Sequence, residues 1–337
     1  MEMFSKKKDT TALRLKTDSF VVESNVHFPT DYNLLWDCVR KCLDTLEYFI
    51  KKYPQLIGWR KMKYWRSELK SYMREVGRIS GSGGKNKEDK LRKATELYLA
   101  KSRLLLKKLL LEKENIPVED IEDLSELYLL EDYIRLLIKH IELVDRRILK
   151  GETIPQAEKM MSIFETYTEW IVKGKSRPSV ELGKKLSITT DQFNLILFHK
   201  VMDKEQDSDI VIEIVDQIRN KYPLIESISL DKGHWNADNK ALLELVIPTV
   251  ILPKLGKQNA KDKELGKNKK YKHLKNKHSA IESNINELEH RGLDRCPDRN
   301  YFHFKTYIAM GVCAYNLKKI GKKILENQLK ALSKKAA

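Results

Sequence analysis

The chain has 337 residues, with 64 Lys and Arg against 48 Asp and Glu, which gives a formal net charge of +16. This length allows two or three domains, or one domain with a large insertion, and the positive charge favours a polyanionic partner, nucleic acid before an anionic membrane surface. The absence of a run of about 18 apolar residues and of a secretory leader pattern excludes a membrane-spanning helix and predicts a soluble, cytoplasmic protein.

The first predicted element is a strand. Residues 12–28 alternate apolar and polar types and are rich in β-branched and aromatic residues, which is typical of a strand, and Asp18 lies within it. After Pro29 the apolar spacing changes to that of a helix, beginning with Leu35, Val39 and Leu43. Helical patterns continue past a flexible break at residues 81–84, so we predict a helical module over residues 31–175.

Four cysteines are present, and only Cys38 and Cys42 are close in sequence. Their i,i+4 spacing suits one face of a helix and differs from the usual spacings of zinc ligands. We therefore expect buried, reduced thiols, while a metal site made of Cys38, Cys42 and a distant His stays open as an alternative.

Strand patterns return after the helical module. Residues 180–202 read as a hairpin with a turn at 190–192, and residues 207–223 as an amphipathic helix with acidic and serine start signals. A strand ending at Asp231, a short helix capped near Asn236 or Asp238, and a further strand from Thr249 complete a parallel crossover unit.

The last part of the chain is predicted to contain a basic segment and two helices. Residues 254–277 are rich in lysine and nearly free of apolar residues, which predicts a loop or mobile arm, and helices are expected from His278 and over residues 304–332. These elements predict an α/β fold with a mixed sheet, a ribonuclease-H-like core in which the helical module joins the first and second strands. The predicted parts are residues 1–30 with the first strand, the helical insertion 31–175, and the remaining core with a C-terminal helix, 176–337.

Three acidic residues are candidates for catalysis. Asp18 lies on the first strand, Asp231 at the carboxyl end of a strand expected beside it, and Glu282 on the helix that follows. Side chains converge at the ends of adjacent strands, and carboxylates are the ligands Mg²⁺ prefers, so the trio suits phosphodiester cleavage by two metal ions. Taken singly, each residue is more readily explained by a solvated, capping or surface-helix role, and only their order along the fold favours the shared site.

Four segments carry a resemblance to a known family. They are LRLKTDSFVVESNVHFPTDYNLLWDCVR, RPSVELGKKLSITTDQFNLILFHKVM, SLDKGHWNADNK and HSAIESNINELEHRGLDRCPD. In this order, and over nearly the whole chain, they resemble the catalytic blocks of bacterial insertion-sequence transposases of the DDE class, in the ISNCY group.

The resemblance implies a reaction, a cofactor and partners. Asp18, Asp231 and Glu282 would be the catalytic and metal-binding triad, with two Mg²⁺ ions for which Mn²⁺ can substitute. The partners would be transposon terminal inverted repeats and target DNA, bound by a homo-oligomer near the nucleoid.

The chain departs from the family pattern at two places. Family members generally carry a helical DNA-binding region before the first Asp, whereas only seventeen residues precede Asp18, which suggests a truncated copy. The positions flanking Glu282 also differ, with His278 four residues before it and Glu289 seven after it, so the DNA-contacting roles of those positions do not transfer directly.

Basic residues on either side of Glu282 are the candidates for DNA contact. They lie in the lysine-rich segment and on the helix that follows: Lys254, Lys257, Lys277, His278 and Arg291.

Two other functions compete with an active transposase. One is a defective or repurposed copy that only binds DNA. The other is an all-helical RNA-binding protein, against which the strand-type hairpin at 180–202 argues.

Overall fold

The computed structural model describes residues 12–336 except 60, 174–178, 258–263 and 265. Its contacts divide the chain into two compact units. The helical unit is Val26–Thr166, and the sheet unit combines Met1–Asn25 with Tyr167–Ala337. No helix in the described part of the chain is long and apolar enough to cross a membrane.

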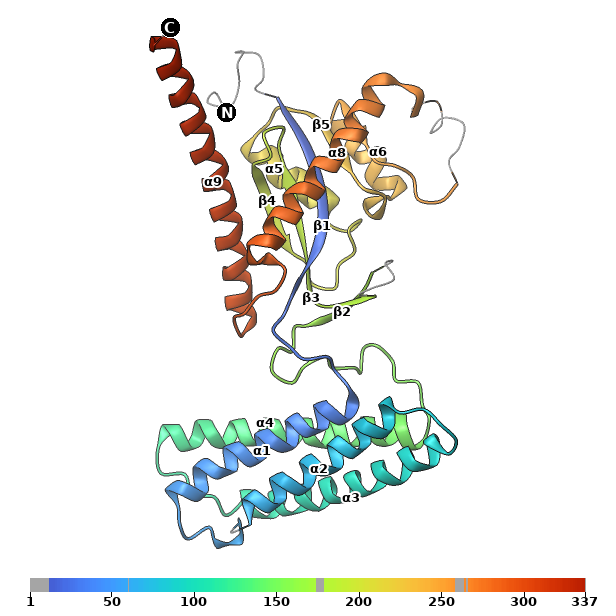
Figure 1. The fold of residues 1–337 in the computed structure, drawn as a ribbon, viewed down its shortest axis with the longest axis vertical. Coiled ribbons are helices and arrows are strands. Elements are labelled where there is room, and N and C mark those ends of the chain that lie inside the picture. Colours follow the sequence, from blue (N-terminus) through green and yellow to red (C-terminus); the bar gives the residue numbers. More distant parts are fainter. Residues whose placement is uncertain (1–11, 60, 174–178, 258–263, 265, 337) are drawn as a thin grey trace. The chain divides into compact units, whose positions relative to one another are not determined.

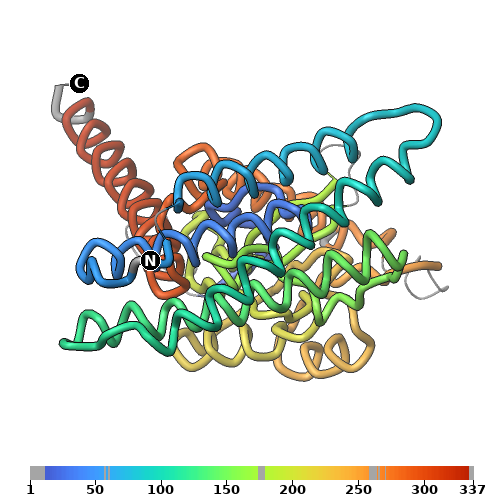
Figure 2. The backbone as a smooth tube through the Cα atoms, turned by 90° about the horizontal axis from the view of Figure 1, so that it is seen from below, coloured from blue at the N-terminus to red at the C-terminus, as the bar shows by residue number. Residues whose placement is uncertain are grey.

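The helical unit contains four long helices that run alongside one another (Figures 1 and 2). They are α1 (Asp31–Lys52), α2 (Met62–Gly81), α3 (Lys87–Lys113) and α4 (Ile121–Val144), with a short turn η1 (Ile57–Trp59) and a final π-helical turn η2 (Asp145–Leu149). Side-chain caps define two of the starts: Thr30 accepts a hydrogen bond from the backbone of Asn33, and Asp120 from that of Asp123.

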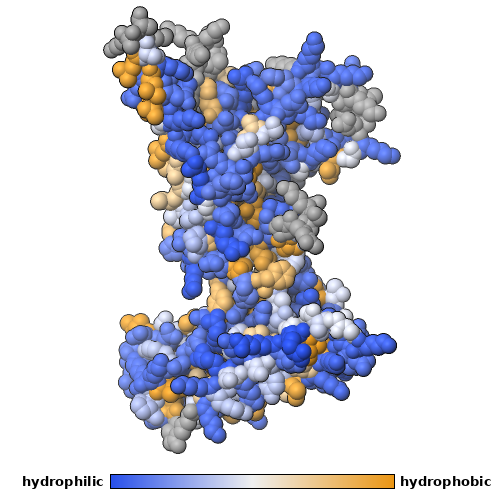
Figure 3. Space-filling view, viewed as in Figure 1, coloured by the Kyte–Doolittle hydropathy of each residue, from blue (hydrophilic) through white to orange (hydrophobic). Residues whose placement is uncertain are grey.

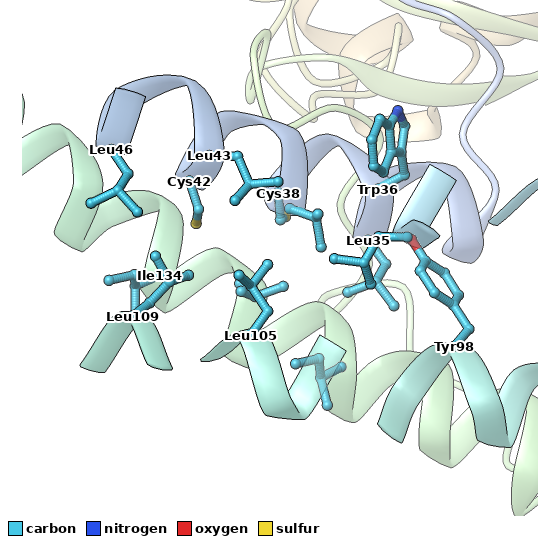
Figure 4. Packing of buried hydrophobic residues seen from close by; sticks show 14 of the residues in the cluster. Leu35, Trp36, Cys38, Cys42, Leu43, Leu46, Tyr98, Leu105, Leu109 and Ile134 are labelled. Carbon is cyan, nitrogen blue, oxygen red and sulfur yellow. The ribbon is translucent and has the colours of Figure 1, made fainter. Parts of the chain in front are cut away.

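Apolar stripes of these helices meet in one core. Leu35 and Leu46 of α1 lie opposite Leu105 of α3 and Ile134 of α4, with Cys42 between them (Figure 4). Cys38 and Cys42 are buried free thiols, as the first of the two readings of this pair predicted, and burial raises the pKa of the Cys42 thiol above its usual range.

The sheet unit is built on a six-stranded mixed sheet. Its strands are β1 (Leu13–Glu23), β2 (Glu169–Val172), β3 (Val180–Thr190), β4 (Ile196–Val201), β5 (Ile225–Leu230) and β6 (Thr249–Ile251). The order is β2-β3-β1-β5-β6, with β4 also on β3; β3 is antiparallel to β1, β2 and β4, whereas β1, β5 and β6 are parallel. This confirms the predicted mixed α/β fold and the neighbouring positions of the strands that lead to Asp18 and Asp231.

Helices cover both faces of the sheet (Figure 1). The helices of this unit are α5 (Val211–Lys221), α6 (Ala237–Val246), α8 (Lys269–Leu288) and α9 (Tyr301–Ala336), with turns η3 (Lys232–His234) and η4 (Glu289–Leu293). Leu13 and Leu15 of β1 share a core with α5 and α6, while Phe20 and Val22 share a second core with α8 and α9. Because side chains alternate along a strand, Arg14, Lys16 and Asp18 lie on the α8 face together with Phe20 and Val22.

The structure corrects two predicted boundaries. The helix expected from His278 begins at Lys269, where Asn268 accepts a hydrogen bond from the backbone of Tyr271, so the last part of the predicted 254–277 loop is helical. Lysine is a good helix former, which explains how a segment with little to bury continues the helix. Residues 258–263 and 265 of that loop lie outside the described residues. The other correction is β2, whose four residues are too short to show a pattern and lie in the range predicted as helical.

Candidate active site

Two carboxylates follow directly from the pairing of two central strands. In the parallel β1–β5 ladder Thr17 lies opposite Leu230, so Asp18 and Asp231 are the next residues on each strand. Both side chains are half-buried, and they are close enough that the charge of Asp231 acts on Asp18. The structure therefore brings together two of the three predicted catalytic residues, Asp18 in the middle of β1 and Asp231 directly after the carboxyl end of β5.

Local contacts fix the carboxylate of Asp231. It caps the turn η3, accepting a 3.1 Å hydrogen bond from the backbone N–H of Gly233 and a second from Nδ1 of the buried His234. Burial alone would raise the pKa of Asp231, but the hydrogen bond and charge of His234 outweigh it and hold the pKa below its usual range. Asp231 is therefore ionised and preoriented.

Asp18 has the opposite electrostatic character. Its carboxylate accepts a 2.8 Å hydrogen bond from the backbone N–H of Ser19. Burial, with a further contribution from the negative charge of Asp231, raises the pKa of Asp18 to about 6. A cation beside the two oxygen donors would remove this cost, so the pair fits a hard divalent ion, which needs only one or two protein carboxylates when it also binds substrate phosphate.

Asp207 is a third carboxylate near the pair and was missed by the sequence analysis. It accepts hydrogen bonds from the Ser19 hydroxyl (2.6 Å) and the Lys185 ammonium (3.0 Å). An added Cβ on Gly233 would lie 3.3 Å from an oxygen of Asp207 and 3.3 Å from both oxygens of Asp231, so the two carboxylates flank the same glycine. In the sequence, Asp207 belongs to the acidic and serine segment that precedes the helix α5. It was therefore interpreted as part of the helix start and not as a candidate for the site.

Glu282 lies apart from the two aspartates. It is exposed on α8, one turn after His278, and the apolar positions Ile281 and Ile285 pack the helix on the sheet as predicted. Among the described residues, no group of three or more His, Cys, Asp or Glu side chains is arranged to hold a metal ion. The Asp18–Asp231 pair is thus assembled without Glu282.

His278 faces inward from α8. Neither of its ring nitrogens has a hydrogen-bond partner in the part of the chain that the structure describes. Burial lowers its pKa, and Asp231, His234 and Glu282 all lie close enough to act on its charge. His278 is therefore within electrostatic reach of both Asp231 and Glu282.

The remaining residues predicted to contact DNA differ in their solvent exposure and in the partners that they already have. Lys257 and Lys277 are exposed, and the Lys254 ammonium lies 5.7 Å from the centre of the Trp235 ring. Arg291, in η4, donates a 3.2 Å hydrogen bond to Glu287 near the end of α8. Hydrophilic residues cover most of the visible face of the sheet unit (Figure 3).

The sheet order, the helices on both faces and the carboxylate pair define a ribonuclease-H-like protein. Comparison with known families adds a match to the transposase DDE domain over residues 143–317. The chain belongs to this family of transposases. The match includes Asp231 and Glu282, whereas Asp18 lies before it. Neither a curated protein nor a solved structure matches the chain.

Proposed function

We propose that this protein is a metal-dependent DNA transposase that cleaves DNA at insertion-sequence ends and joins it to target DNA, with Asp18, Asp231 and Glu282 as the catalytic residues. The observation that carries the proposal is the Asp18–Asp231 pair on adjacent parallel strands, at the point where β5 ends beside the middle of β1, in a chain of the DDE family. Glu282 is the third member because its helix packs over the sheet that carries both aspartates.

The pair would hold Mg²⁺, with two ions in the complete site and Mn²⁺ as a substitute. When bound, such ions activate the attacking oxygen and stabilise the leaving oxygen of a phosphodiester. The protein's own part is orientation: His234 and Gly233 fix Asp231, and Ser19 holds Asp18. Glu282 would complete the ligand set from α8.

DNA is the proposed substrate throughout, as terminal inverted repeat and as target. The net charge of +16 supplies the counterion release on which affinity for a phosphate backbone depends. The exposed Lys257 and Lys277 are the best placed of the predicted contacts, followed by Lys254, while Arg291 would first have to leave Glu287. We propose a homo-oligomer on DNA, since strand transfer joins two ends.

The test is nicking of supercoiled plasmid by purified protein with Mg²⁺ or Mn²⁺. Asp231→Asn should lower the rate by about 100-fold or more, because a lost metal ligand costs several kcal/mol of transition-state stabilisation. Asp216→Asn, at an exposed position of α5, is the matched control and should nick like the wild type. Equal nicking by wild type and Asp231→Asn, or nicking without divalent ions, would refute the proposal.

A copy that binds DNA without cutting it is the second candidate. The position of Glu282 outside the aspartate pair favours it, since described residues alone do not form a three-ligand group. In that case wild type, Asp18→Asn and Asp231→Asn would bind DNA with equal salt dependence, and none would nick it.

A further inference from the structure

A cavity of about 240 Å³, lined by both polar and apolar side chains, lies in the sheet unit under the N-terminal half of α8. Its floor is formed by β1, β5 and β6, and its wall by Leu274, Lys277 and Ala280 of α8. Further toward the C-terminus of the same helix, Ile281 and Ile285 close the apolar core over Phe20 and Val22. The N-terminal half of α8 therefore lies over the cavity, and its C-terminal half packs on the apolar core.

The strand pattern places this cavity next to the carboxylate pair. Lys16 is two residues before Asp18 on β1, and Ser229 is two residues before Asp231 on β5. Residues two apart share a face and are separated by about 7 Å. Lys16 and Ser229 therefore lie opposite each other in the β1–β5 ladder, one step along the same face from the two aspartates.

Positive charge accumulates in the cavity. Three cationic side chains line it, those of Lys16, Arg14 and Lys277. Lys16 donates a 3.0 Å hydrogen bond to the amide oxygen of Asn194, a neutral partner. Arg14 is 4.0 Å from Glu226, so it is only loosely paired.

A buried hydroxyl in the same cavity is free to bind a ligand. Ser229 is only 5% exposed, lines the cavity, and its Oγ has no hydrogen-bond partner among the residues that the structure describes. An unpaired buried hydroxyl costs free energy. A ligand that accepts from the hydroxyl and is attracted by two lysines would relieve that cost together with the repulsion between the cations.

We propose that this cavity binds a phosphate group of the DNA strand, one position along from the phosphodiester at Asp18 and Asp231. Ser229 donates to a phosphate oxygen, and Lys16 and Lys277 provide the positive charge. The inference rests on the proposed function for its source of phosphate. A free inorganic phosphate shares the chemistry, and the experiment separates the two.

The first measurement is the salt dependence of DNA affinity in EDTA, so that it does not depend on catalysis. A labelled duplex is titrated with wild type, Lys16→Gln, Lys277→Gln and Ser229→Ala, and with Lys221→Gln as a control on the last turn of α5. Loss of one lysine contact should lower the slope of log K against log salt by about 1 and weaken binding at all sequences. Ser229→Ala should weaken binding and leave the slope unchanged.

The second measurement uses inorganic phosphate alone. At equal ionic strength, phosphate should raise the melting temperature of wild type and Lys221→Gln more than that of Ser229→Ala and Lys277→Gln, after the general effect of the anion common to all four proteins is subtracted. Lys277 is exposed, so its replacement leaves the fold intact. A phosphate-specific shift without any change in DNA binding would assign the cavity to the free anion and overturn the DNA proposal.

Equal slopes and affinities for wild type, Lys277→Gln and Ser229→Ala would also overturn the inference. Metal-dependent nicking by those variants at the wild-type rate would then leave the proposed function standing. Conversely, reduced slopes in a protein that never nicks DNA would keep the phosphate site and reject catalysis.

Discussion

Asp18 and Asp231 are neighbours whose pKa values are shifted in opposite directions, and their contacts explain the difference. Asp231 accepts a hydrogen bond from His234, which holds its pKa low, whereas Asp18 has the backbone N–H of Ser19 and a nearby negative charge. With its pKa near 6, Asp18 holds a proton more readily than an ordinary aspartate when no cation is present. The pair is therefore under electrostatic strain that a divalent ion relieves.

This strain predicts the pH dependence of stability in EDTA. Because the pKa of Asp18 rises from its ordinary value of 3.8 to about 6 on folding, the native state binds more protons between these values, and stability falls as pH rises through that window. The contribution is at most about 1.4 kcal/mol per pH unit. Asp18→Asn should remove it, so the variant should be more stable than wild type at pH 7.5 and equal to it near pH 4.

Urea midpoints measured at several pH values check this prediction. Added Mg²⁺ should stabilise wild type at pH 7.5 and have no such effect on Asp18→Asn. A wild type whose stability relative to the variant does not change with pH would contradict the raised pKa.

At the scale of elements, β1 and β3 form the centre of the sheet and approach most closely at Gly183. This residue pairs with Glu23 of β1 and with Glu169 of β2. A Cβ at Gly183 would lie 2.0 Å from the carbonyl oxygen of Val22, a contact with backbone that cannot rotate away. Position 183 therefore requires glycine, because the backbone of β1 lies too close for a side chain.

Gly183→Ala should lower the free energy of unfolding by about 3 kcal/mol, since the two strands must separate locally. Gly321→Ala is the matched control: a Cβ there meets no atom within 4 Å, and alanine favours the helical conformation of α9. Urea unfolding followed by circular dichroism distinguishes the two variants. If Gly183→Ala lowered the free energy of unfolding no more than Gly321→Ala changed it, the close contact between position 183 and the backbone of Val22 would be contradicted.

Periodicity predicted the elements well where they bury a regular face. The alternation around Asp18 identified β1, and the spacing of Ile281, Ile285 and Leu288 identified the packed part of α8. It failed where burial ends, as at Lys269, because a solvated lysine-rich turn has no apolar stripe. Asp207 could not be found either, because its role depends on contacts with Ser19 and Lys185 from strands distant in sequence.

At the scale of the whole molecule, the helical unit has a core of its own. Phe49, Trp59 and Tyr98 are almost completely buried within it, and the salt bridge of Arg147 with Asp31 joins its last turn to its first helix. The unit enters the chain between two strands, after β1 and before β2. We propose that it is an independent domain.

Residues 26–166 produced alone should therefore fold. We expect a helical circular dichroism spectrum and a cooperative thermal transition, because the apolar stripes of α1, α3 and α4 find their partners inside the fragment. A spectrum of disordered chain, or a broad non-cooperative transition, would show that the unit needs the rest of the protein.

The place of the helical unit also affects the order of events on the ribosome. Leu13 of β1 pairs with Ile225 of β5, so the first strand emerges long before its partner is made. At about 5–20 residues per second, this delay is on the order of 10 to 40 s. Throughout it the nascent β1 has unsatisfied edges, which are prone to intermolecular pairing, while the helices behind it can already fold from local contacts. Protection of the nascent β1 from intermolecular pairing is therefore needed until β3 and then β5 have been made.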